Sequence, residues 1–120
     1  MIARASLPAH LAERTHVVRG GSRTAPGAFV LYWMHHAVRA HENPALDVAL
    51  RAAVSDRLPL VVCQGLGGRR AHNSDRHHTF ILQGAREVQR ELAERGITYA
   101  FHLVRRADVP GPLRSHRRAA

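Results

Sequence analysis

Three short apolar runs, separated by longer polar or amphipathic segments, dominate the hydrophobic pattern of this chain. They lie at residues 29–34, 58–63 and 97–104. Each run has the length of a strand and is rich in branched or aromatic side chains, and a continuous rather than alternating apolar run is typical of a strand covered on both faces. The pattern therefore predicts three buried strands.

A helix is predicted between the first two runs, beginning at Asn43 and Pro44. An asparagine side chain caps free backbone amides, and proline at the first helical position loses no hydrogen bond. Leu46, Leu50 and Ala53 then recur at helical spacing. We expect this helix to end near residue 55.

A second, longer helix is predicted between the second and third runs. Ser74 or Asp75 is the expected cap, and Gly96 is the expected stop. One face of this helix is apolar at helical spacing, formed by Ile81, Ala85, Val88 and Leu92.

The order strand, helix, strand, helix, strand indicates the α/β class with a parallel sheet. Two right-handed crossovers place both helices on the same face of such a sheet. Parallel sheets are normally covered on both faces. We therefore expect a three-stranded parallel half of a Rossmann-like, doubly wound sheet, which is an incomplete domain.

The remaining segments divide the chain into three parts. Residues 1–28 are interpreted as a basic lead-in arm, with a short helical turn at residues 9–14, and residues 29–104 as the partial α/β domain. Residues 105–120 are rich in arginine, proline and glycine. With little to bury, they are expected to form a disordered tail.

The net charge of +9 raises the question of a polyanionic partner. All 18 basic residues are arginine, which resembles a GC-rich coding bias, and most of them are scattered along the chain. Scattered charge is typical of a solvated surface. A small basic nucleic-acid-binding protein, whose arm and tail contact phosphates, stays open as an alternative.

The single cysteine, Cys63, lies in an apolar run. It excludes a disulfide framework within the chain and favours a reducing compartment with a buried thiol. No window has the roughly 18 apolar residues of a membrane span, and the first 28 residues lack a secretion signal. The expectation is a cytoplasmic protein without a membrane partner.

Loops that follow the strands, at residues 35–43, 64–75 and 105 onward, are where an α/β sheet binds ligands. The first loop has no glycine, which argues against a dinucleotide fingerprint. The "GLGG" stretch at residues 65–68 is interpreted as a flexible connection that ends the second strand, in preference to a phosphate cradle.

Histidines are frequent near the first two loops, but their spacing matches no metal motif. No nucleophile lies on a strand-to-helix elbow. We therefore predict no metal site and no catalytic residue. The histidines concerned are His35, His36, His41, His72, His77 and His78.

The stretches "VLYWM", "HHAVRAHEN" and "PAL" together resemble the amino-terminal α/β domain of the DNA photolyase and cryptochrome family, class II in particular. "LPLVVCQGL", "DRHHTFILQGAREVQREL" and "GITYAFHLV" are similar to the family's second strand, second helix and third strand, and the likeness runs from about residue 17 to residue 104. His35, His36, Ala37 and Pro44 depart from the usual pattern, which indicates a divergent branch. The positions that carry the resemblance are Tyr32, Trp33, Met34, Arg39, Asn43, Ala45, Leu46, Arg76, His77, Phe80, Leu82 and Gly84.

The resemblance implies a role in light-driven repair of cyclobutane pyrimidine dimers. In the family, an antenna chromophore such as a deazaflavin or a folate passes excitation energy to reduced FAD, which donates an electron to the dimer. Family members carry FAD and DNA on a large helical region that is not expected in this chain, so the chain alone is expected to be a truncated, inactive form. Met34, His35 and Arg39 are candidates to line an antenna cleft; the alternative is that Arg39 only ties its loop to the domain.

Three hypotheses on function follow. The first is a partial photolyase α/β domain, whose partner is a carboxyl-terminal photolyase region or a second copy bound through the edge of the first strand. The second is a stand-alone module that binds a small ligand or a partner protein. The third is the nucleic-acid-binding protein described above.

Overall fold

The computed structural model describes residues 3–20, 27–67 and 75–104. Predictions for the tail and for residues 68–74, including Ser74 as a cap, lie outside these ranges. In chain order the elements are the 3₁₀ helix η1 (Arg4–Ser6), α1 (Ala9–Ala12), β1 (Val30–Trp33), α2 (Pro44–Asp56), β2 (Leu60–Gly67), α3 (Asp75–Glu94) and β3 (Thr98–Val104).

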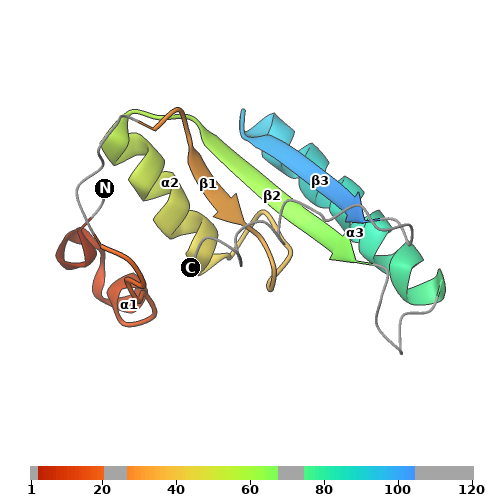
Figure 1. The fold of residues 1–120 in the computed structure, drawn as a ribbon, viewed down its shortest axis with the longest axis horizontal. Helices are drawn as coiled ribbons and strands as arrows, with labels where there is room; N and C mark the ends of the chain where they lie inside the picture. Colours follow the sequence, from red (N-terminus) through yellow and green to blue (C-terminus); the bar gives the residue numbers. More distant parts are fainter. Residues whose placement is uncertain (1–2, 21–26, 68–74, 105–120) are drawn as a thin grey trace.

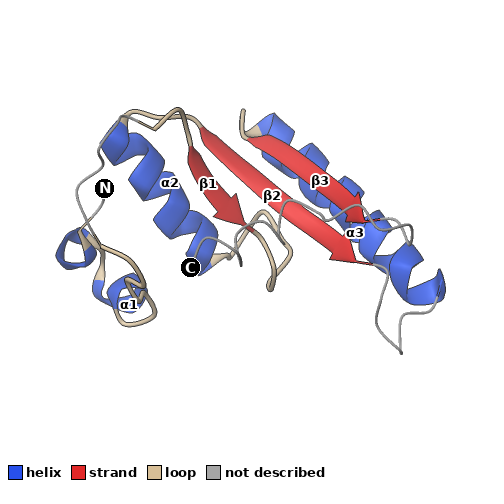
Figure 2. Ribbon diagram, in the orientation of Figure 1, coloured by secondary structure: helices blue, strands red, loops and turns tan. Residues whose placement is uncertain are grey.

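The three strands form one parallel sheet in the order β1-β2-β3. Their arrowheads point the same way, and α2 and α3 are the two crossovers (Figures 1 and 2). Tyr32 of β1 aligns with Val62 of β2, which aligns with Tyr99 of β3. The predicted α/β class and strand order are confirmed.

The sequence prediction for the end of β2 was wrong. We expected the glycines from residue 65 onward to break the strand, but β2 continues through Gly67. Gly65 and Gly67 pair with His102 and Val104, and Leu66 between them is buried. Pairing along the whole length of β3 therefore overrides the low strand propensity of glycine.

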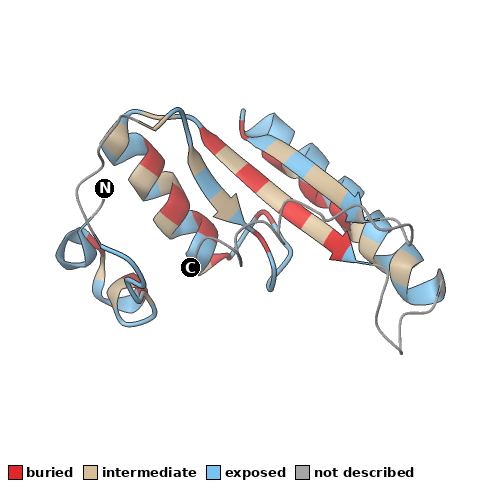
Figure 3. Ribbon diagram, viewed as in Figure 1, coloured by how far each residue is buried: buried red, intermediate tan, exposed pale blue. Residues whose placement is uncertain are grey.

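Both helices pack on one face of the sheet. Alternate residues of β2 are buried on this side (Figure 3), and one apolar cluster joins them to residues of α2 and α3. This confirms that two right-handed crossovers place their helices together. The cluster consists of Met34, Ala40, Leu46, Ala49, Ala53, Leu60, Val62, Val88, Leu92 and Ile97.

The opposite face of the sheet, which we name the open face, is apolar and carries no helix from the described part of the chain. Leu31 is 53% exposed and Trp33 is 48% exposed. By register they align with Val61 and Cys63 of β2, and Cys63 aligns with Ala100 of β3. Cys63 was expected to be buried in the core but is only partly buried, because no helix among the described residues packs on this face.

Local signals set the ends of the two long helices as expected. The Asn43 side chain accepts a hydrogen bond from the Leu46 amide (3.2 Å), and Pro44 follows at the first helical position. At the end of α3, Gly96 has a φ of 70° and the Ile97 amide donates to the Leu92 carbonyl (2.9 Å). Glycine adopts this left-handed conformation without a steric penalty. Within the described ranges, no helix is long and apolar enough to cross a membrane.

Candidate functional site

The loop of residues 35–43 lies at the carboxyl end of β1, and Asn43 organises it from within. Asn43 is a buried polar residue whose Nδ2 donates to the carbonyls of Ala37 and Arg39, both at 3.1 Å, and to the Tyr32 hydroxyl at 3.2 Å. Its Oδ1 meanwhile caps α2 at Leu46. One side chain therefore fixes the loop, the helix start and a core tyrosine together.

A second set of contacts tightens the same loop. Nε and Nη2 of Arg39 both donate to the Glu42 carbonyl, at 3.0 and 2.8 Å. Ala37 and Glu42 have φ values of 49° and 46°, a conformation in which few residues with a Cβ are found. Since the loop has no glycine at these positions, the contacts of Asn43 and Arg39 are what stabilise its shape.

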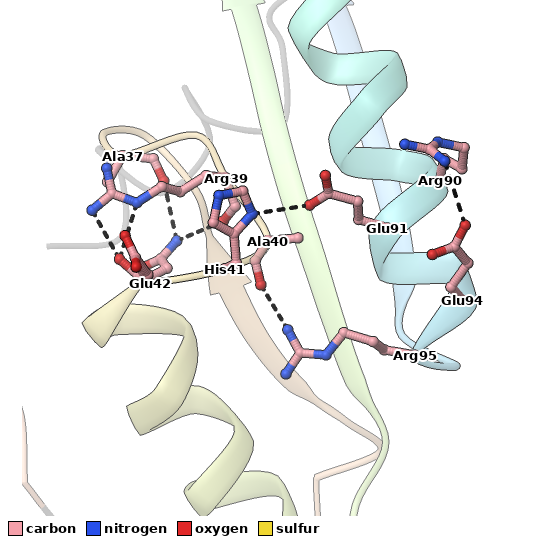
Figure 4. Close-up of polar contacts among 10 residues, drawn as sticks. Ala37, Arg39, Ala40, His41, Glu42, Arg90, Glu91, Glu94 and Arg95 are labelled. Carbon is pink, nitrogen blue, oxygen red and sulfur yellow. Dashed lines mark hydrogen bonds and ion pairs between the residues drawn. The ribbon is translucent and has the colours of Figure 1, made fainter.

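Helix α3 and the residue that follows it, Arg95, hold the loop from the side (Figure 4). Arg95 Nη1 donates to the Ala40 carbonyl at 2.6 Å, and Nδ1 of His41 lies 3.3 Å from Glu91 Oε2. These contacts join residues about fifty positions apart in the sequence. By contrast, the exposed pair of Arg90 and Glu94 lies within the helix (3.7 Å) and is of a kind that contributes little to stability.

Three aromatic rings stack where β1 runs into the loop. The Trp33 and His35 ring centroids are 5.7 Å apart, and those of His35 and His36 are 4.5 Å apart. Both histidines are exposed and Trp33 is half exposed. The stack presents flat ring surfaces to solvent at the edge of the sheet where parallel α/β folds bind ligands.

The three residues predicted to line an antenna cleft lie in different surroundings. Met34 is only 1% exposed and belongs to the core cluster, which also includes Ala40 of the loop. His35 is exposed within the ring stack, and Arg39 is exposed while bound to the Glu42 carbonyl. The Arg39 contacts support the loop-tying alternative. Contact of any of the three with a ligand stays a prediction.

Several contributors to the site were not found from the sequence. Tyr32 was named only as a strand residue and as a position of the family resemblance, and Arg95 and Glu91 were not singled out at all. Their contacts depend on how α3 packs beside the loop, which leaves no local signal. The Asn43–Pro44 pair was predicted as a helix start. The same asparagine could have pointed to the hydrogen bonds that its side chain makes within the loop.

A buried polar pair lies further along the sheet, on the core side. The Tyr99 hydroxyl donates to Oε1 of buried Gln64 at 2.6 Å. Burial, with a smaller effect of Cys63, raises the pKa of Tyr99 from 10.0 to about 12. The neutral phenol is therefore the form that the fold stabilises.

Stability is expected to fall at alkaline pH because of Tyr99. The pKa of Tyr99 is near 10 in the unfolded chain and about 12 in the folded one. The free energy that the neutral phenol contributes to folding is therefore fully present below pH 10 and is lost as the pH rises through 12. Tyr99→Phe should flatten this loss and cost about 1 kcal/mol at neutral pH, because Gln64 loses its partner. Urea unfolding followed by circular dichroism at several pH values measures both effects. If the free energy of unfolding changes with pH in the same way for the unmodified chain and for Tyr99→Phe, Tyr99 is not the cause of the alkaline loss.

The other histidines of the described residues do not gather into a metal-binding group. Within residues 3–20, 27–67 and 75–104, no three of the side chains histidine, cysteine, aspartate and glutamate are placed to hold an ion together. His77 and His78 lie on α3 with tilted rings, and His72 is outside the described ranges.

Comparisons with known proteins agree with the resemblance seen in the sequence. A family model described as DNA photolyase matches residues 30–115. A deoxyribodipyrimidine photo-lyase of Methanothermobacter thermautotrophicus is 40% identical over 86 residues, which is 72% of this chain and 19% of the relative. The protein of the same name from Potorous tridactylus is 38% identical over 77 residues, which is 64% of this chain and 14% of that relative. The chain thus spans less than a fifth of the length of these curated relatives, yet the match covers most of its strands and helices, and it belongs to the DNA photolyase family.

Proposed function

We propose that this chain supplies part of the α/β domain of a light-driven DNA repair protein of the deoxyribodipyrimidine photo-lyase type. Its membership of the family and the similarity to two photo-lyases support this. The observation that carries the proposal is the loop of residues 35–43, which the hydrogen bonds of Asn43 hold at the edge where parallel α/β sheets bind ligands. Contact with DNA and repair of dipyrimidine damage belong to the assembled protein and are part of the proposal.

The exposed residues of this loop fit a flat, aromatic chromophore. Trp33, His35 and His36 offer stacked ring surfaces, and aromatic rings bind other rings by offset stacking. The described residues do not fit FAD at the same place, because a loop without glycine keeps the backbone away from a pyrophosphate. An antenna chromophore, when bound, would absorb light and pass the energy on to a flavin.

Four residues of the loop, together with Arg95, then have defined tasks. His35 and His36 provide the contact surface, while Arg39 keeps the Glu42 carbonyl turned toward its guanidinium. Asn43 and Arg95 fix the loop backbone. Such preorganisation reduces the entropy lost when a ligand binds.

Titration of the chain with a 5-deazaflavin tests the proposal. Trp33 is the single tryptophan of the sequence, so its fluorescence reports a ring that binds beside it. We expect saturable quenching, with affinity at least tenfold weaker after replacement of His35 and His36 by alanine. His10→Ala, an exposed histidine of α1, is the matched control. No saturable binding, or equal affinity in the double variant, would reject an antenna site at this loop.

A further inference from the structure

His35 and His36 are stacked on one another at the point where β1 runs into the loop. Their ring centroids are 4.5 Å apart with 29° between the ring planes, and the His35 ring lies 5.7 Å from the Trp33 ring at 18°. Both histidines are exposed. A stack of two imidazoles differs from a stack of two apolar rings, because each imidazole can take up a proton and become a cation.

One positive charge is compatible with this stack. Histidine is the side chain that ordinarily changes its charge between about pH 5 and 8. A cation within about 6 Å of the centroid of a tryptophan ring, over its face, is attracted by that ring, and His35 lies within this distance of Trp33. The first proton is therefore accommodated on His35, between the indole and the neutral ring of His36.

A second positive charge is not compatible with the stack. With both rings protonated, two unit charges would lie 4.5 Å apart, and their repulsion shifts an equilibrium by roughly fivefold even when it is screened as in water. Within the described residues, no ion pair joins either ring to a carboxylate that would offset this repulsion. Two exposed side chains relieve the repulsion by turning apart.

The other charged groups around the loop do not reverse this order. The Arg39 guanidinium, which donates to the Glu42 carbonyl, adds a further positive charge. Glu91 of α3 lies 3.3 Å from His41, and this contact becomes stronger when His41 is protonated, so it holds the loop more firmly as the pH falls. The remaining charged or titratable groups where the neighbouring elements meet the loop are the Glu42 carboxylate, Asp47 in the first turn of α2, Cys63 of β2 and Arg95 after α3.

We propose that the His35–His36 pair is a proton-operated switch of the aromatic surface to which the chromophore binds; this rests on the proposed function. Above about pH 7 the rings stack and present a continuous flat surface beside Trp33. As the pH falls toward about 5 both rings become charged, the stack opens, and an uncharged flat ligand loses its contact surface. Both histidines depart from the usual pattern of the family, so the switch is not expected throughout the family.

The switch is tested first without any ligand. Nuclear magnetic resonance follows the imidazole Cε1 protons of the full chain from pH 8 to pH 5, and His35→Ala and His36→Ala assign the two rings. We expect the second proton to be taken up at a pH about 0.7 lower than the same ring shows when its partner is alanine, because a fivefold penalty corresponds to this shift. The ring-current shift that each Cε1 proton receives from the neighbouring ring should disappear with this second step.

Binding is measured separately with 5-deazariboflavin, an uncharged probe, through the fluorescence of Trp33. The affinity of the unmodified chain should be at least fivefold weaker at pH 5 than at pH 8. His36→Phe keeps a flat ring that cannot be charged, so its affinity should change less than twofold between the two pH values. His10→Ala, on α1, should behave like the unmodified chain, and His41→Gln, which removes the contact with Glu91, should keep the same ratio of affinities.

Other outcomes would overturn the proposal. These are proton uptake by each ring at the same pH with and without its partner, equal affinity of the unmodified chain at both pH values, or the same loss of affinity in His36→Phe. Unfolding at pH 5, seen by circular dichroism, would assign the loss of binding to the whole fold and would also reject the switch. Absence of 5-deazariboflavin binding at pH 8 rejects the antenna function, whereas the proton steps and ring-current shifts decide separately whether the stack opens.

Discussion

Replacement of Leu92 by alanine is expected to lower the free energy of unfolding by about 2 to 5 kcal/mol, the largest stability effect of any single change considered for this chain. Leu92 of α3 is fully buried in the cluster that joins both helices to the sheet. Its carbonyl also accepts the Ile97 amide, which fixes the turn between α3 and β3. The truncation leaves a cavity at the point where α3, the sheet and this turn meet. Urea unfolding measured by circular dichroism gives the difference.

The same helix offers a matched control. Leu82 is 41% exposed, so Leu82→Ala removes the same atoms from a site that is partly in water and should cost less than about 1 kcal/mol. If Leu92→Ala does not fold, Leu92→Val keeps a measurable transition, with an expected loss of about 1 kcal/mol. Equal losses at Leu92 and Leu82 would show that the cluster does not hold α3 to the sheet.

Local signals made much of the fold predictable from sequence. Asn43–Pro44 fixed the start of α2, and Gly96 fixed the end of α3, because capping depends on residues next to each other in the chain. Continuous apolar runs located the three strands because strands of a parallel sheet are largely buried. Right-handed crossovers then determined which face the helices cover.

Features that depend on distant contacts were not predictable in this way. β2 extends through Gly67 because β3 pairs with it along its whole length. The loop of residues 35–43 was chosen as a site from its position after β1. The residues that hold it are Glu91, near the end of α3, and Arg95, the residue that follows this helix. Met34 was proposed for the cleft by its position in the sequence. That its side chain is buried in the core depends on the packing of the helices on the sheet, and its contact with a ligand stays a prediction.

The open face is where the predicted and the observed burial of the strands differ. Its apolar residues were predicted from sequence to be buried on both sides, and the structure covers only one side with the residues it describes. Trp33 can report on both places, because the same ring belongs to the open face and to the aromatic stack of the loop.

The loop itself depends on Asn43, and Asn43→Ala is expected to cost about 2 to 3 kcal/mol of unfolding free energy. Loss of the helix cap accounts for about 1 kcal/mol. The remainder comes from the carbonyls of Ala37 and Arg39, which lose the Nδ2 donor in a partly buried place. The positive φ values of Ala37 and Glu42 then lack the contacts that stabilise them.

Asn43→Asp separates the two tasks of this side chain. Aspartate keeps an oxygen that caps the Leu46 amide but has no hydrogen to donate to the two carbonyls, so the loop loosens while α2 keeps its start. We expect amide hydrogen exchange to accelerate at residues 37–42 in both variants, and at the first turn of α2 only in Asn43→Ala. Unchanged exchange in the loop of Asn43→Asp would show that Arg39 and Arg95 hold it without Asn43. If the exchange does accelerate there, weakened deazaflavin binding by the same variant would show that the shape of the loop, and not only its exposed rings, makes the site.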